Sequence, residues 1–450
     1  MKNEIFRAYD IRGIVPDDIN EETSYIFGKS FGTYVQKYFN KSTVLVGHDN
    51  RLSSDMIHDN LIKGIIEVGA NVIDLGLVTT PMFYYARYYL NNYVGVMITA
   101  SHNPKEYNGF KISFNELGNA LGDEIQNFKD FVNLKEYNNS LNYGTISKYD
   151  IREKYIDNMI NSLKISGKKL KIVFDCGNGT GSIIIKEILD KLNMEYDLLY
   201  CESNGNFPNH HPDPAVNKNL IDLQKRVVEL NYDLGVAVDA DCDRVRVVDE
   251  RGNIIDSDIL MSILYKYMNN NLKVRKAVYD VKCSKSLIDT LESLNIEGIM
   301  WRTGNSYLNR KFHEEHLDFS GEYSGHFYFS DNYFGYDDGI YAGLRVVEML
   351  SNCAKSLSTL VNEIPKYYAS EEMIIKSTDT EKYNVVNNIK KYVIDKKYNY
   401  CDIDGIRVLF NDGWALVRVS NTGPNLTVRF EGNTPERLEK IKQEFLNLLK

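Results

Sequence analysis

The chain lacks any uninterrupted apolar run that approaches membrane-spanning length. No apolar segment follows its first residues, Met1 to Glu4, so we expect neither secretion nor membrane insertion. The six cysteines are scattered between Cys176 and Cys401 and show neither the paired spacing of a metal site nor a small disulfide framework, which favours a reducing cytoplasm. The chain also has no basic block, and its net charge of −9 argues against nucleic acid as a partner.

The composition is that of an ordinary globular protein, with 43% hydrophobic and 26% charged residues. Its 450 residues are too many for one hydrophobic core and predict three or four domains. An internal repeat supports this division, because a strand, a polar turn, a helix and a second strand follow one another three times. The repeats begin at Thr43, Leu170 and Arg275, and each is a unit of the parallel α/β kind.

One more short strand follows each repeat and ends in a loop with reactive side chains. These strands cover residues 94–98, 233–238 and 317–320, and they lead to Ser101, Asp239 and Glu322. Parallel sheets place their ligands beyond the carboxyl ends of the strands. We therefore expect three related mixed α/β domains, each presenting one loop to a shared central cleft.

The last part of the chain has a different plan. We expect a helix at residues 383–395 and strands at 371–376, 406–410, 414–420 and 425–430. Thr434 as N-cap and Pro435 at the first helical position predict a terminal helix. This pattern indicates a smaller α+β C-terminal domain. The expected domains cover residues 1–144, 145–251, 252–366 and 367–450.

The loop after the first short strand has the composition of a phosphoryl carrier. Pro104 keeps the preceding residue extended and should hold Ser101 at the apex of the turn. Asn108-Gly109 predicts a tight reversal, after which a returning strand brings Lys111 back towards Ser101. A fixed hydroxyl with His102 and Lys111 nearby suits covalent group transfer, and a plain turn is the alternative.

Asp239, Asp241 and Asp243 place three carboxylates at alternate positions. In a curled loop they can converge on a single hard cation, and without one they would repel each other. An acidic turn without an ion is the alternative. A calcium loop fits less well, because glycine is missing at the sixth position, where Arg244 stands, and the strand-like segment 245–248 follows instead.

Five stretches, in this order, resemble the α-D-phosphohexomutases. They are FRAYDIRG at 6–13, TASHNP with NGFK at 99–111, DADCDR at 239–244, GEYSGH at 321–326 and RVSNTGPNLTVRFEG at 418–432. The resemblance covers essentially the whole chain. It implies an enzyme that interconverts hexose 1-phosphate and hexose 6-phosphate, of mannose, glucose or both. Ser101 would carry the phosphoryl group, and a hexose 1,6-bisphosphate would be the intermediate and the activator.

The resemblance also implies roles for the residues of the first two domains. Mg²⁺ would bind to Asp239, Asp241 and Asp243 together with an oxygen of the Ser101 phosphate. Arg12 and Arg244 would stabilise the phosphoryl oxygens, and Tyr9 would contact the substrate. Lys111 and His102 are the candidates for proton transfer at the acceptor hydroxyl. Cys242 stands where the family commonly has a smaller residue, so we expect it either to tighten the aspartate loop or to expose it to oxidation or to thiophilic metals.

Two further motifs would recognise the sugar phosphate. In GEYSGH, Glu322 and Ser324 suit vicinal sugar hydroxyls with His326 as a further contact, and Tyr323 is closer to the phosphomannomutases and phosphoglucomutases than to phosphoglucosamine mutases. A polar turn is the alternative. The clamp for the non-reacting phosphate would comprise Arg418, Ser420, Asn421, Thr422 and Arg429. An isolated polar hairpin is the alternative there.

The same resemblance gives an interpretation of Lys282 and Asn305, whereas the segment 177–181 is interpreted from its own spacing. Lys282 would face the substrate, with a solvent-facing lysine as the alternative. Asn305 stands where many relatives have histidine, so it can hydrogen-bond but cannot carry charge. The segment 177–181 lacks the spacing of a dinucleotide loop and is interpreted as structural.

Three other functions remain open at this stage. A phosphoglucosamine mutase would share the machinery and differ at the sugar loop, a metal-dependent sugar phosphatase would release inorganic phosphate, and a non-catalytic sensor would only bind. The expected partners are small-molecule sugar phosphates. We expect neither nucleic acid nor membrane as a partner, and a monomer or weak dimer in the cytoplasm.

Overall fold

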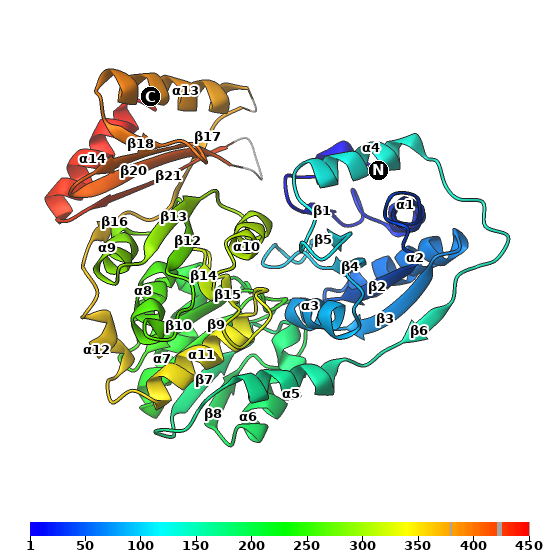
Figure 1. The fold of residues 1–450 in the computed structure, drawn as a ribbon, viewed down its shortest axis with the longest axis horizontal. Coiled ribbons are helices and arrows are strands. Elements are labelled where there is room, and N and C mark those ends of the chain that lie inside the picture. The colour runs from blue at the N-terminus through cyan, green and yellow to red at the C-terminus, as the bar shows by residue number, and fades with distance from the viewer. Residues whose placement is uncertain (379, 421–424, 450) are drawn as a thin grey trace. The chain divides into compact units, whose positions relative to one another are not determined.

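The computed structural model describes residues 1–378, 380–420 and 425–449 (Figure 1). The chain forms two compact units, each made of two stretches of sequence. The first unit comprises Met1–Ile255 and Ser324–Ser358, and the second comprises Asp256–Tyr323 and Thr359–Lys450. The last boundary falls within the short helix α12 (Leu357–Val361).

The first unit contains a six-stranded sheet with the strand order β1-β5-β4-β2-β3-β6. Strands β2, β3, β4 and β6 are parallel, whereas β5 runs antiparallel to both of its neighbours. The strands are β1 (Ile11–Ile14), β2 (Thr43–His48), β3 (Asn71–Leu77), β4 (Gly95–Ile98), β5 (Tyr107–Ser113) and β6 (Ile146–Lys148). The helices of this part are α1 (Glu21–Phe39), α2 (Ser54–Glu67), α3 (Thr80–Tyr89) and α4 (Asp123–Leu134).

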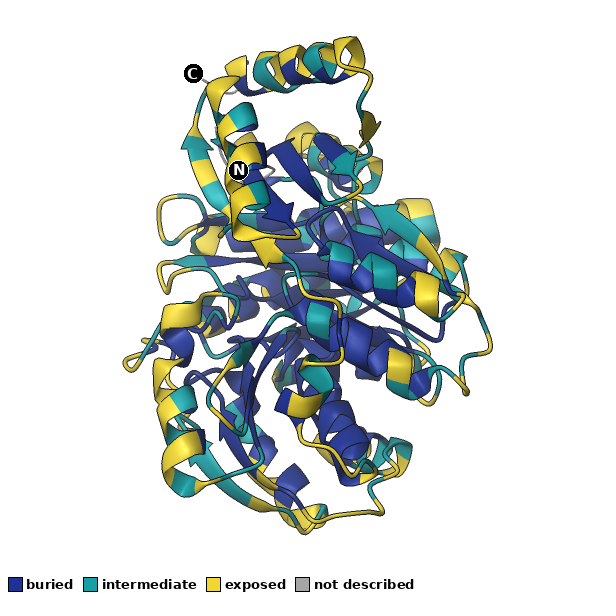
Figure 2. Cartoon of the chain, turned by 90° about the vertical axis from the view of Figure 1, so that its left-hand side faces the viewer, coloured by how far each residue is buried: buried dark blue, intermediate teal, exposed yellow. Residues whose placement is uncertain are grey.

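The core of this sheet forms because alternate strand residues point to opposite faces. Val44 and Val46 of β2 join a buried cluster with residues of α1, α2 and α4, including Phe27 and Phe31. Helices α1 and α2 approach very closely, since a Cβ atom at Gly28 would lie 2.1 Å from the backbone oxygen of Leu61. Figure 2 shows the buried residues concentrated on the strands and on the inner helix faces.

The first unit also contains a five-stranded sheet with the order β11-β10-β9-β7-β8. Strand β7 is parallel to β8 and β9, and β10 is antiparallel to β9 and β11. The strands are β7 (Lys171–Asp175), β8 (Glu195–Leu199), β9 (Leu234–Val238), β10 (Val245–Asp249) and β11 (Ile254–Ile255), with β15 (Phe327–Phe329) outside this sheet. The helices are α5 (Arg152–Ser162), α6 (Ile185–Lys191), α7 (Ile221–Leu230) and α11 (Gly339–Ser351).

The second unit begins with the third α/β repeat and ends with a six-stranded sheet. In the repeat, β12 (Lys276–Asp280) is parallel to β13 (Glu297–Trp301). Around it are β14 (Phe319–Gly321), α8 (Ser257–Met268), α9 (Lys285–Ser293) and α10 (Asn305–Glu314). The six-stranded sheet contains β16 (Tyr368–Ala369), β17 (Met373–Lys376), β18 (Asn399–Cys401), β19 (Ile406–Phe410), β20 (Gly413–Val419) and β21 (Asn425–Gly432), with α13 (Glu381–Asp395) and α14 (Pro435–Asn447) packed on its core.

The predicted fold class is confirmed in its main features. All three repeats form a pair of parallel strands joined by a helix, and the fourth segment is an α+β arrangement of antiparallel strands and two helices. In the second repeat, a short 3-10 turn at Thr180–Ile183 precedes α6. The side chain of Thr434 caps α14 by accepting a hydrogen bond from the Arg437 backbone, as the sequence predicts.

The predicted tight reversal at Asn108-Gly109 is wrong. Both residues lie inside β5, and the chain reverses earlier, between β4 and β5. Because β5 is hydrogen-bonded to β1 on one side and β4 on the other, it begins as a strand at Tyr107. Gly109 serves a close approach rather than a turn, since a Cβ atom there would lie 2.2 Å from the Ile11 oxygen.

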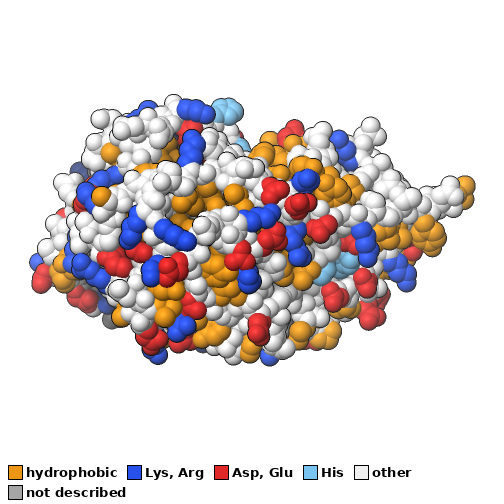
Figure 3. Space-filling view, turned by 90° about the horizontal axis from the view of Figure 1, so that it is seen from below, with side chains coloured by type: hydrophobic (Ala, Val, Ile, Leu, Met, Phe, Trp, Pro, Cys, Tyr) orange, Lys and Arg blue, Asp and Glu red, His pale blue; other side chains and the backbone are white. Residues whose placement is uncertain are grey.

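The structure also contains a cysteine pair that the sequence spacing did not indicate. Cys176, at the end of β7, forms a disulfide with Cys201, which follows β8, and their Cα atoms lie 5.1 Å apart. Among the described residues, no helix combines the length and the apolarity needed to cross a membrane. On the face drawn in Figure 3, basic and acidic side chains are interspersed.

Candidate active site

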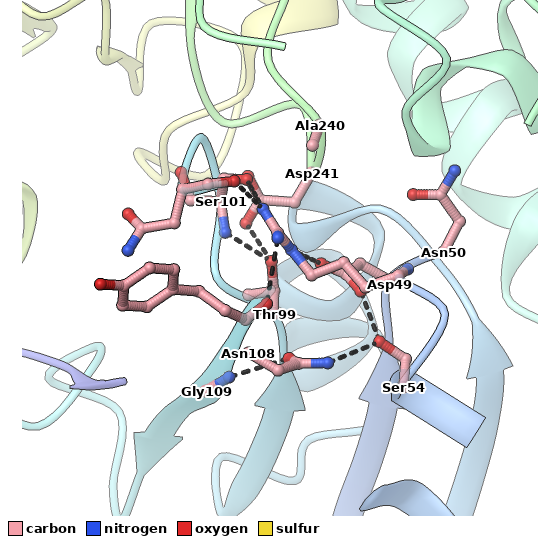
Figure 4. Close-up of polar contacts among 12 residues, drawn as sticks. Asp49, Asn50, Ser54, Thr99, Ser101, Asn108, Gly109, Ala240 and Asp241 are labelled. Carbon is pink, nitrogen blue, oxygen red and sulfur yellow. Dashed lines mark hydrogen bonds and ion pairs between the residues drawn. The ribbon is translucent and has the colours of Figure 1, made fainter. Parts of the chain in front are cut away.

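Ser101 lies in the loop that connects β4 to β5 in the first unit (Figure 4). Its backbone is in the left-handed region with φ +50°, and its N–H donates to Thr99 Oγ1 at 2.9 Å. The side chain is 1% exposed, so it does not project into solvent from the apex of the turn. Instead, its hydroxyl donates a 2.9 Å hydrogen bond to Asp239 Oδ2.

The three aspartates of the DADCDR loop come together beside Ser101. The loop lies between β9 and β10, and one oxygen from each of Asp239, Asp241 and Asp243 lies within 4.8 Å of the others. All three side chains are buried, and Asp241 Oδ1 has no hydrogen-bond partner among the described residues. Three converging carboxylates and an unpartnered buried oxygen fit a hard divalent cation, which prefers oxygen ligands. The cluster is therefore able to bind a metal ion.

Lys111 of β5 neutralises two of these carboxylates. Its Nζ lies 2.8 Å from Asp241 Oδ2 and 2.5 Å from Asp243 Oδ2. Burial alone would lower the pKa of Lys111, but Asp241 and Asp243 outweigh it and raise this pKa well above its ordinary value. For Asp239, burial together with Asp243 and Asp241 raises the pKa well above its ordinary value. Burial also favours a raised pKa at Asp243, yet Lys111 and His326 hold that pKa well below its ordinary value.

Two threonine hydroxyls orient Asp241. Thr80 Oγ1, at the start of α3, donates to Asp241 Oδ2 at 2.7 Å, and Thr99 Oγ1 donates to the same oxygen at 3.1 Å. The Thr80 backbone N–H also donates to the backbone oxygen of Asp241 at 2.9 Å. Neither threonine was predicted as a site residue, and Thr80 lies outside every motif. The position of Thr99, two residues before Ser101, was the available signal.

Charged and polar groups of other elements surround the Ser101 loop. Arg12 of β1 donates to Asn103 Oδ1 at 2.8 Å and pairs with Asp10 at 3.0 Å. His102 Nδ1 lies 3.2 Å from Ser101 Oγ. Burial and the nearby Arg244 and Arg12 lower the pKa of His102 well below its ordinary value, so its ring is neutral. Tyr9 is half-buried in the bend that precedes β1.

The end of the GEYSGH motif packs against the metal loop within the first unit. His326 Nε2 lies 3.4 Å from Asp243 Oδ1 and 3.3 Å from Arg244 Nε, and its Nδ1 lies 3.0 Å from Ser324 Oγ. The Arg244 backbone N–H donates to Asp239 Oδ1 at 3.1 Å. Asp337 lies near His326 at 3.8 Å, and burial together with Asp243 raises the pKa of Asp337 to about 7. The structure thus brings Ser324, His326 and Arg244 to the aspartate cluster.

Cys242 lies within the loop that carries the three aspartates, and it is enclosed by the protein. It is fully buried, its φ is +69°, and burial raises the pKa of its thiol well above the ordinary value. The expectation that it exposes the loop to oxidation is therefore wrong. The segment 177–181 lies against the same loop, where Thr180 donates to the Ala240 oxygen from both its backbone N–H and its hydroxyl.

In the second unit, other predicted site residues contact two carboxylates that the sequence did not predict, those of Asp404 and Glu372. Asp404 accepts from Arg418 at 3.0 and 3.3 Å and from the backbone N–H of Thr303 at 3.0 Å. Glu322 accepts from the Gly304 backbone at 3.0 Å, directly before Asn305. Lys282 Nζ lies 3.4 Å from Glu372 Oε2. Burial would lower the pKa of Lys282, but Glu372 and Asp280 raise it above its ordinary value.

Arg429 contacts protein groups in this unit. Its guanidinium lies 3.8 Å from the centre of the Tyr323 ring, donates to the Lys282 backbone oxygen and lies 4.0 Å from Asp258. Ser420 closes the hairpin by donating its backbone N–H to the Asn425 oxygen at 2.9 Å. Asn421 and Thr422 lie outside the described residues. Binding of a phosphate by Arg418, Ser420 and Arg429 stays a prediction.

Comparisons with known proteins agree with one another along the whole chain. The four domain profiles of the phosphoglucomutase/phosphomannomutase family match residues 3–137, 153–252, 256–368 and 361–448, the first three as α/β/α domains I to III and the fourth as the C-terminal domain. A phosphomannomutase/phosphoglucomutase from Pseudomonas putida is 38% identical over 446 residues, which are 99% of this chain and 95% of that protein. A phosphomannomutase from Methanocaldococcus jannaschii is 34% identical and covers 99% and 97% of the two chains. The crystal structure of a phosphoglucomutase/phosphomannomutase family protein from Burkholderia thailandensis matches with a TM-score of 0.90 at 31% identity, covering 100% of this chain and 98% of that one.

Proposed function

Because the chain belongs to the phosphoglucomutase/phosphomannomutase family of α-D-phosphohexomutases, we propose that it interconverts hexose 1-phosphate and hexose 6-phosphate, of mannose, glucose or both. It is a phosphotransferase enzyme of the isomerase type. One observation carries the proposal: the hydroxyl of Ser101 lies 2.9 Å from Asp239 within a buried group of three carboxylates. A serine in this place can carry a phosphoryl group whose charge a cation would balance.

The reaction consists of two transfers in opposite directions. In the first, the bond between Ser101 Oγ and phosphorus breaks and a bond from phosphorus to a sugar oxygen forms. The sugar hydroxyl loses its proton to a base, and the released Ser101 Oγ takes up a proton and becomes a hydroxyl. The product is a hexose 1,6-bisphosphate, which also serves as the activator. In the second transfer, after the bisphosphate has turned around, the bond between the other sugar oxygen and its phosphorus breaks and a bond from that phosphorus to Ser101 Oγ forms. The Ser101 hydroxyl gives up its proton as this bond forms, and the released sugar oxygen takes up a proton. Asp239 Oδ2 accepts the hydrogen bond of that hydroxyl at 2.9 Å.

The surrounding side chains have separate roles in these transfers. Arg12 and Arg244 stabilise the phosphoryl oxygens through charge-assisted hydrogen bonds. Lys111 and His102 move the proton at the acceptor hydroxyl, and the two differ in charge. Lys111 is held as an ammonium by Asp241 and Asp243, whereas His102 is neutral and can accept a proton. Tyr9 contacts the substrate.

We further propose that the resident ion is Mg²⁺, held by Asp239, Asp241, Asp243 and an oxygen of the Ser101 phosphate. Carboxylate oxygens and a phosphate oxygen are the ligands that Mg²⁺ prefers. When bound, the ion neutralises charge on the phosphoryl group during transfer. Lys111 would keep the carboxylates compensated whenever the ion is absent, since it lies within 2.8 Å of two of them.

The sugar and its second phosphate are recognised by the remaining predicted residues. Glu322, Ser324 and His326 bind the sugar hydroxyls, and Lys282 and Asn305 contact the same ligand. Arg418, Ser420, Asn421, Thr422 and Arg429 clamp the phosphate that does not react. In this proposal each domain supplies one part of the site. Residues 1–144 carry the phosphoserine loop, 145–251 the metal-binding loop, 252–366 the sugar-recognition loop and 367–450 the clamp for the second phosphate. We propose a monomer or weak dimer located in the cytoplasm.

Turnover of purified protein tests this function. Mannose, glucose and glucosamine 1-phosphates are supplied in parallel, each with Mg²⁺ and a trace of the matching 1,6-bisphosphate, and the 6-phosphates are measured. We expect turnover of the mannose or glucose compound that exceeds that of the glucosamine compound. The Ser101→Ala protein should lose activity, whereas Ser147→Ala, which alters an exposed serine of β6, should keep it.

Four results would contradict the proposal. Preference for glucosamine 1-phosphate would indicate a phosphoglucosamine mutase, and steady release of inorganic phosphate would indicate a phosphatase. Binding without turnover would indicate a sensor. Isomerisation by Ser101→Ala at the rate of the parent would exclude the phosphoserine route.

A further inference from the structure

The turn between β2 and α2 contains a buried arginine directly beneath the Ser101 loop. Arg51 Nη2 donates to the backbone oxygens of Ser101 at 2.6 Å and Asn103 at 2.7 Å. Its Nη1 donates to the backbone oxygens of Pro104 at 2.7 Å and Tyr107 at 3.0 Å. The side chain is 0% exposed, so no water replaces these contacts. One guanidinium thus satisfies four carbonyls of the loop that carries the reactive hydroxyl.

Asp49 holds this arginine in place. Its Oδ2 lies 3.2 Å from Arg51 Nε, and its Oδ1 accepts from the Arg51 backbone N–H at 3.0 Å and from Ser54 Oγ at 2.6 Å. Ser54 Oγ in turn accepts from Asn108 Nδ2 at 3.0 Å, and Asn108 Oδ1 accepts from the Gly109 N–H at 2.8 Å. Figure 4 shows this chain of contacts running from Asp49 through Ser54 and Asn108 to Gly109. The contacts fix the turn to the strand that follows the Ser101 loop.

The middle residue of the same turn reaches the support of the metal loop. Asn50 Nδ2 donates to the Asn178 backbone oxygen at 2.7 Å and to Ser203 Oγ at 3.0 Å. Two residues beyond Asn178, the Thr180 N–H donates to the Ala240 oxygen at 2.7 Å, between the metal-binding Asp239 and Asp241. A three-residue turn therefore contacts the Ser101 loop on one side and, through the segment 178–180, the aspartate loop on the other.

From this arrangement we propose that Asp49, Asn50 and Arg51 are positioning residues that hold Ser101 in register with the three aspartates. The proposal rests on the proposed function, because register matters only if a phosphoryl group moves at Ser101. None of the three touches the reacting atoms. They act by fixing the backbone, and misplacement of a reacting group by about 1 Å lowers a rate roughly 100-fold. A guanidinium suits this task because its planar fork offers five fixed donors, whereas an ammonium offers three from one point.

The substitution Arg51→Lys tests the proposal, with Arg87→Lys as the matched control. Arg87 is also buried in the first unit, and its Nη2 also donates to backbone oxygens, those of Asn115 at 3.0 Å and Gly118 at 3.5 Å. It lies outside the turn and the Ser101 loop. Each protein is phosphorylated with glucose 1,6-bisphosphate and compared by steady-state kinetics and by the ³¹P spectrum of the phosphoserine.

We expect Arg51→Lys to lower kcat at least about tenfold while KM for the hexose phosphate changes less than about threefold. The ³¹P resonance of its phosphoserine should broaden or split, because the loop then occupies more than one arrangement. Arg87→Lys should retain the kcat and the single resonance of the parent. If Arg51 had only a structural role, Arg51→Lys would lower thermal stability to the same extent as Arg87→Lys and would leave the phosphoserine resonance unchanged. That outcome would overturn the proposal.

Other results would overturn the proposal. A folded Arg51→Lys protein with the kcat and the phosphoserine resonance of the parent would do so. If Arg51→Lys does not fold, Asn50→Ala decides: a kcat lowered about fivefold at an unchanged melting temperature supports the proposal, and the kcat of the parent overturns it. A parent protein that takes no phosphate from the bisphosphate would instead contradict the proposed function itself.

Discussion

Removal of the ammonium of Lys111 should reveal how strongly the aspartate cluster depends on a cation. Lys111→Met keeps a long apolar side chain in β5 but leaves Asp241 and Asp243 without the charge that lies 2.8 and 2.5 Å away. Asp241 retains the hydroxyls of Thr80 and Thr99, whereas Asp243 retains only His326 at 3.4 Å among these contacts. Loss of one partner of a buried ion pair typically costs about 3–5 kcal/mol.

Protonation of a carboxylate limits this loss. An aspartate with an ordinary pKa takes up a proton at a cost of about 4 kcal/mol near pH 7 and about 1.5 kcal/mol near pH 5. In the parent, the pKa of Asp243 is held low, so its contribution to stability is present above the unfolded pKa and is lost in acid. In Lys111→Met the pKa of one carboxylate rises, so the folded protein binds an extra proton and its deficit shrinks as the pH falls.

Thermal unfolding in EDTA measures the deficit. For a large cooperative unit, a loss of 3–4 kcal/mol corresponds to a midpoint lowered by about 6–10 °C near pH 7. The difference from the parent should be less than half as large near pH 5, and saturating Mg²⁺ should remove most of it near pH 7. Lys186→Met, which alters an exposed pair with Asp190, should not move the midpoint. Equal midpoints of Lys111→Met and the parent in EDTA, or a deficit that grows in acid, would refute the reasoning.

Three further outcomes are expected. Burial opposes the charge of His58, but Asp74 and Asp59 raise its pKa. Its contribution to stability is therefore full below about pH 6.5 and is lost as the pH rises through the folded pKa. His58→Gln should lower the urea midpoint more near pH 6 than near pH 8.5, and the reverse order would exclude this pairing. Arg418→Met should raise KM for the hexose phosphate about tenfold or more with a smaller effect on kcat, since it would remove the charge-assisted bonds that we propose to the distal phosphate. Initial-rate kinetics with an unchanged KM would contradict that role. Mild peroxide should leave the activity of the parent and of Cys242→Ala equal, because the thiol is fully buried and its pKa is raised, and selective inactivation of the parent would show that it is accessible.

The chemistry of the site could be read from local sequence to a large extent. Two patterns were recognisable from residues close together in the chain. One is the alternation of Asp239, Asp241 and Asp243, and the other is Ser101 followed by His-Asn-Pro. The strand–helix–strand repeats were equally local, because alternation and turn residues lie within about 30 positions. The Asn108-Gly109 pair misled the prediction for the same reason: it has the composition of a turn, but pairing of β5 with two distant strands keeps it extended.

Other parts of the site had no local signal. Thr80 and Asp241 are 161 positions apart, and Arg51 and Ser101 are 50 apart, so no spacing rule links them. The Cys176–Cys201 bond likewise depends on the parallel pairing of β7 with β8, which brings the ends of both strands to the same edge. Asp404 is one of 62 acidic residues, and only its contacts with Arg418 and Thr303 distinguish it.

By itself, the sequence determined which groups this protein has available: a serine that can carry phosphate, three carboxylates for a cation, and basic residues for phosphate. These depend on residue type and short-range order. Only the tertiary structure decided which of these groups meet. Pairing places β4 beside β5 in one sheet, and packing within the first unit brings the loop after β9, from another sheet, against Ser101 and Lys111 and buries these side chains. Burial favours the neutral form of both Lys111 and His102, and their neighbours then decide the charge. Asp241 and Asp243 raise the pKa of Lys111 and hold it as an ammonium, whereas Arg244 and Arg12 lower the pKa of His102 further and keep it neutral.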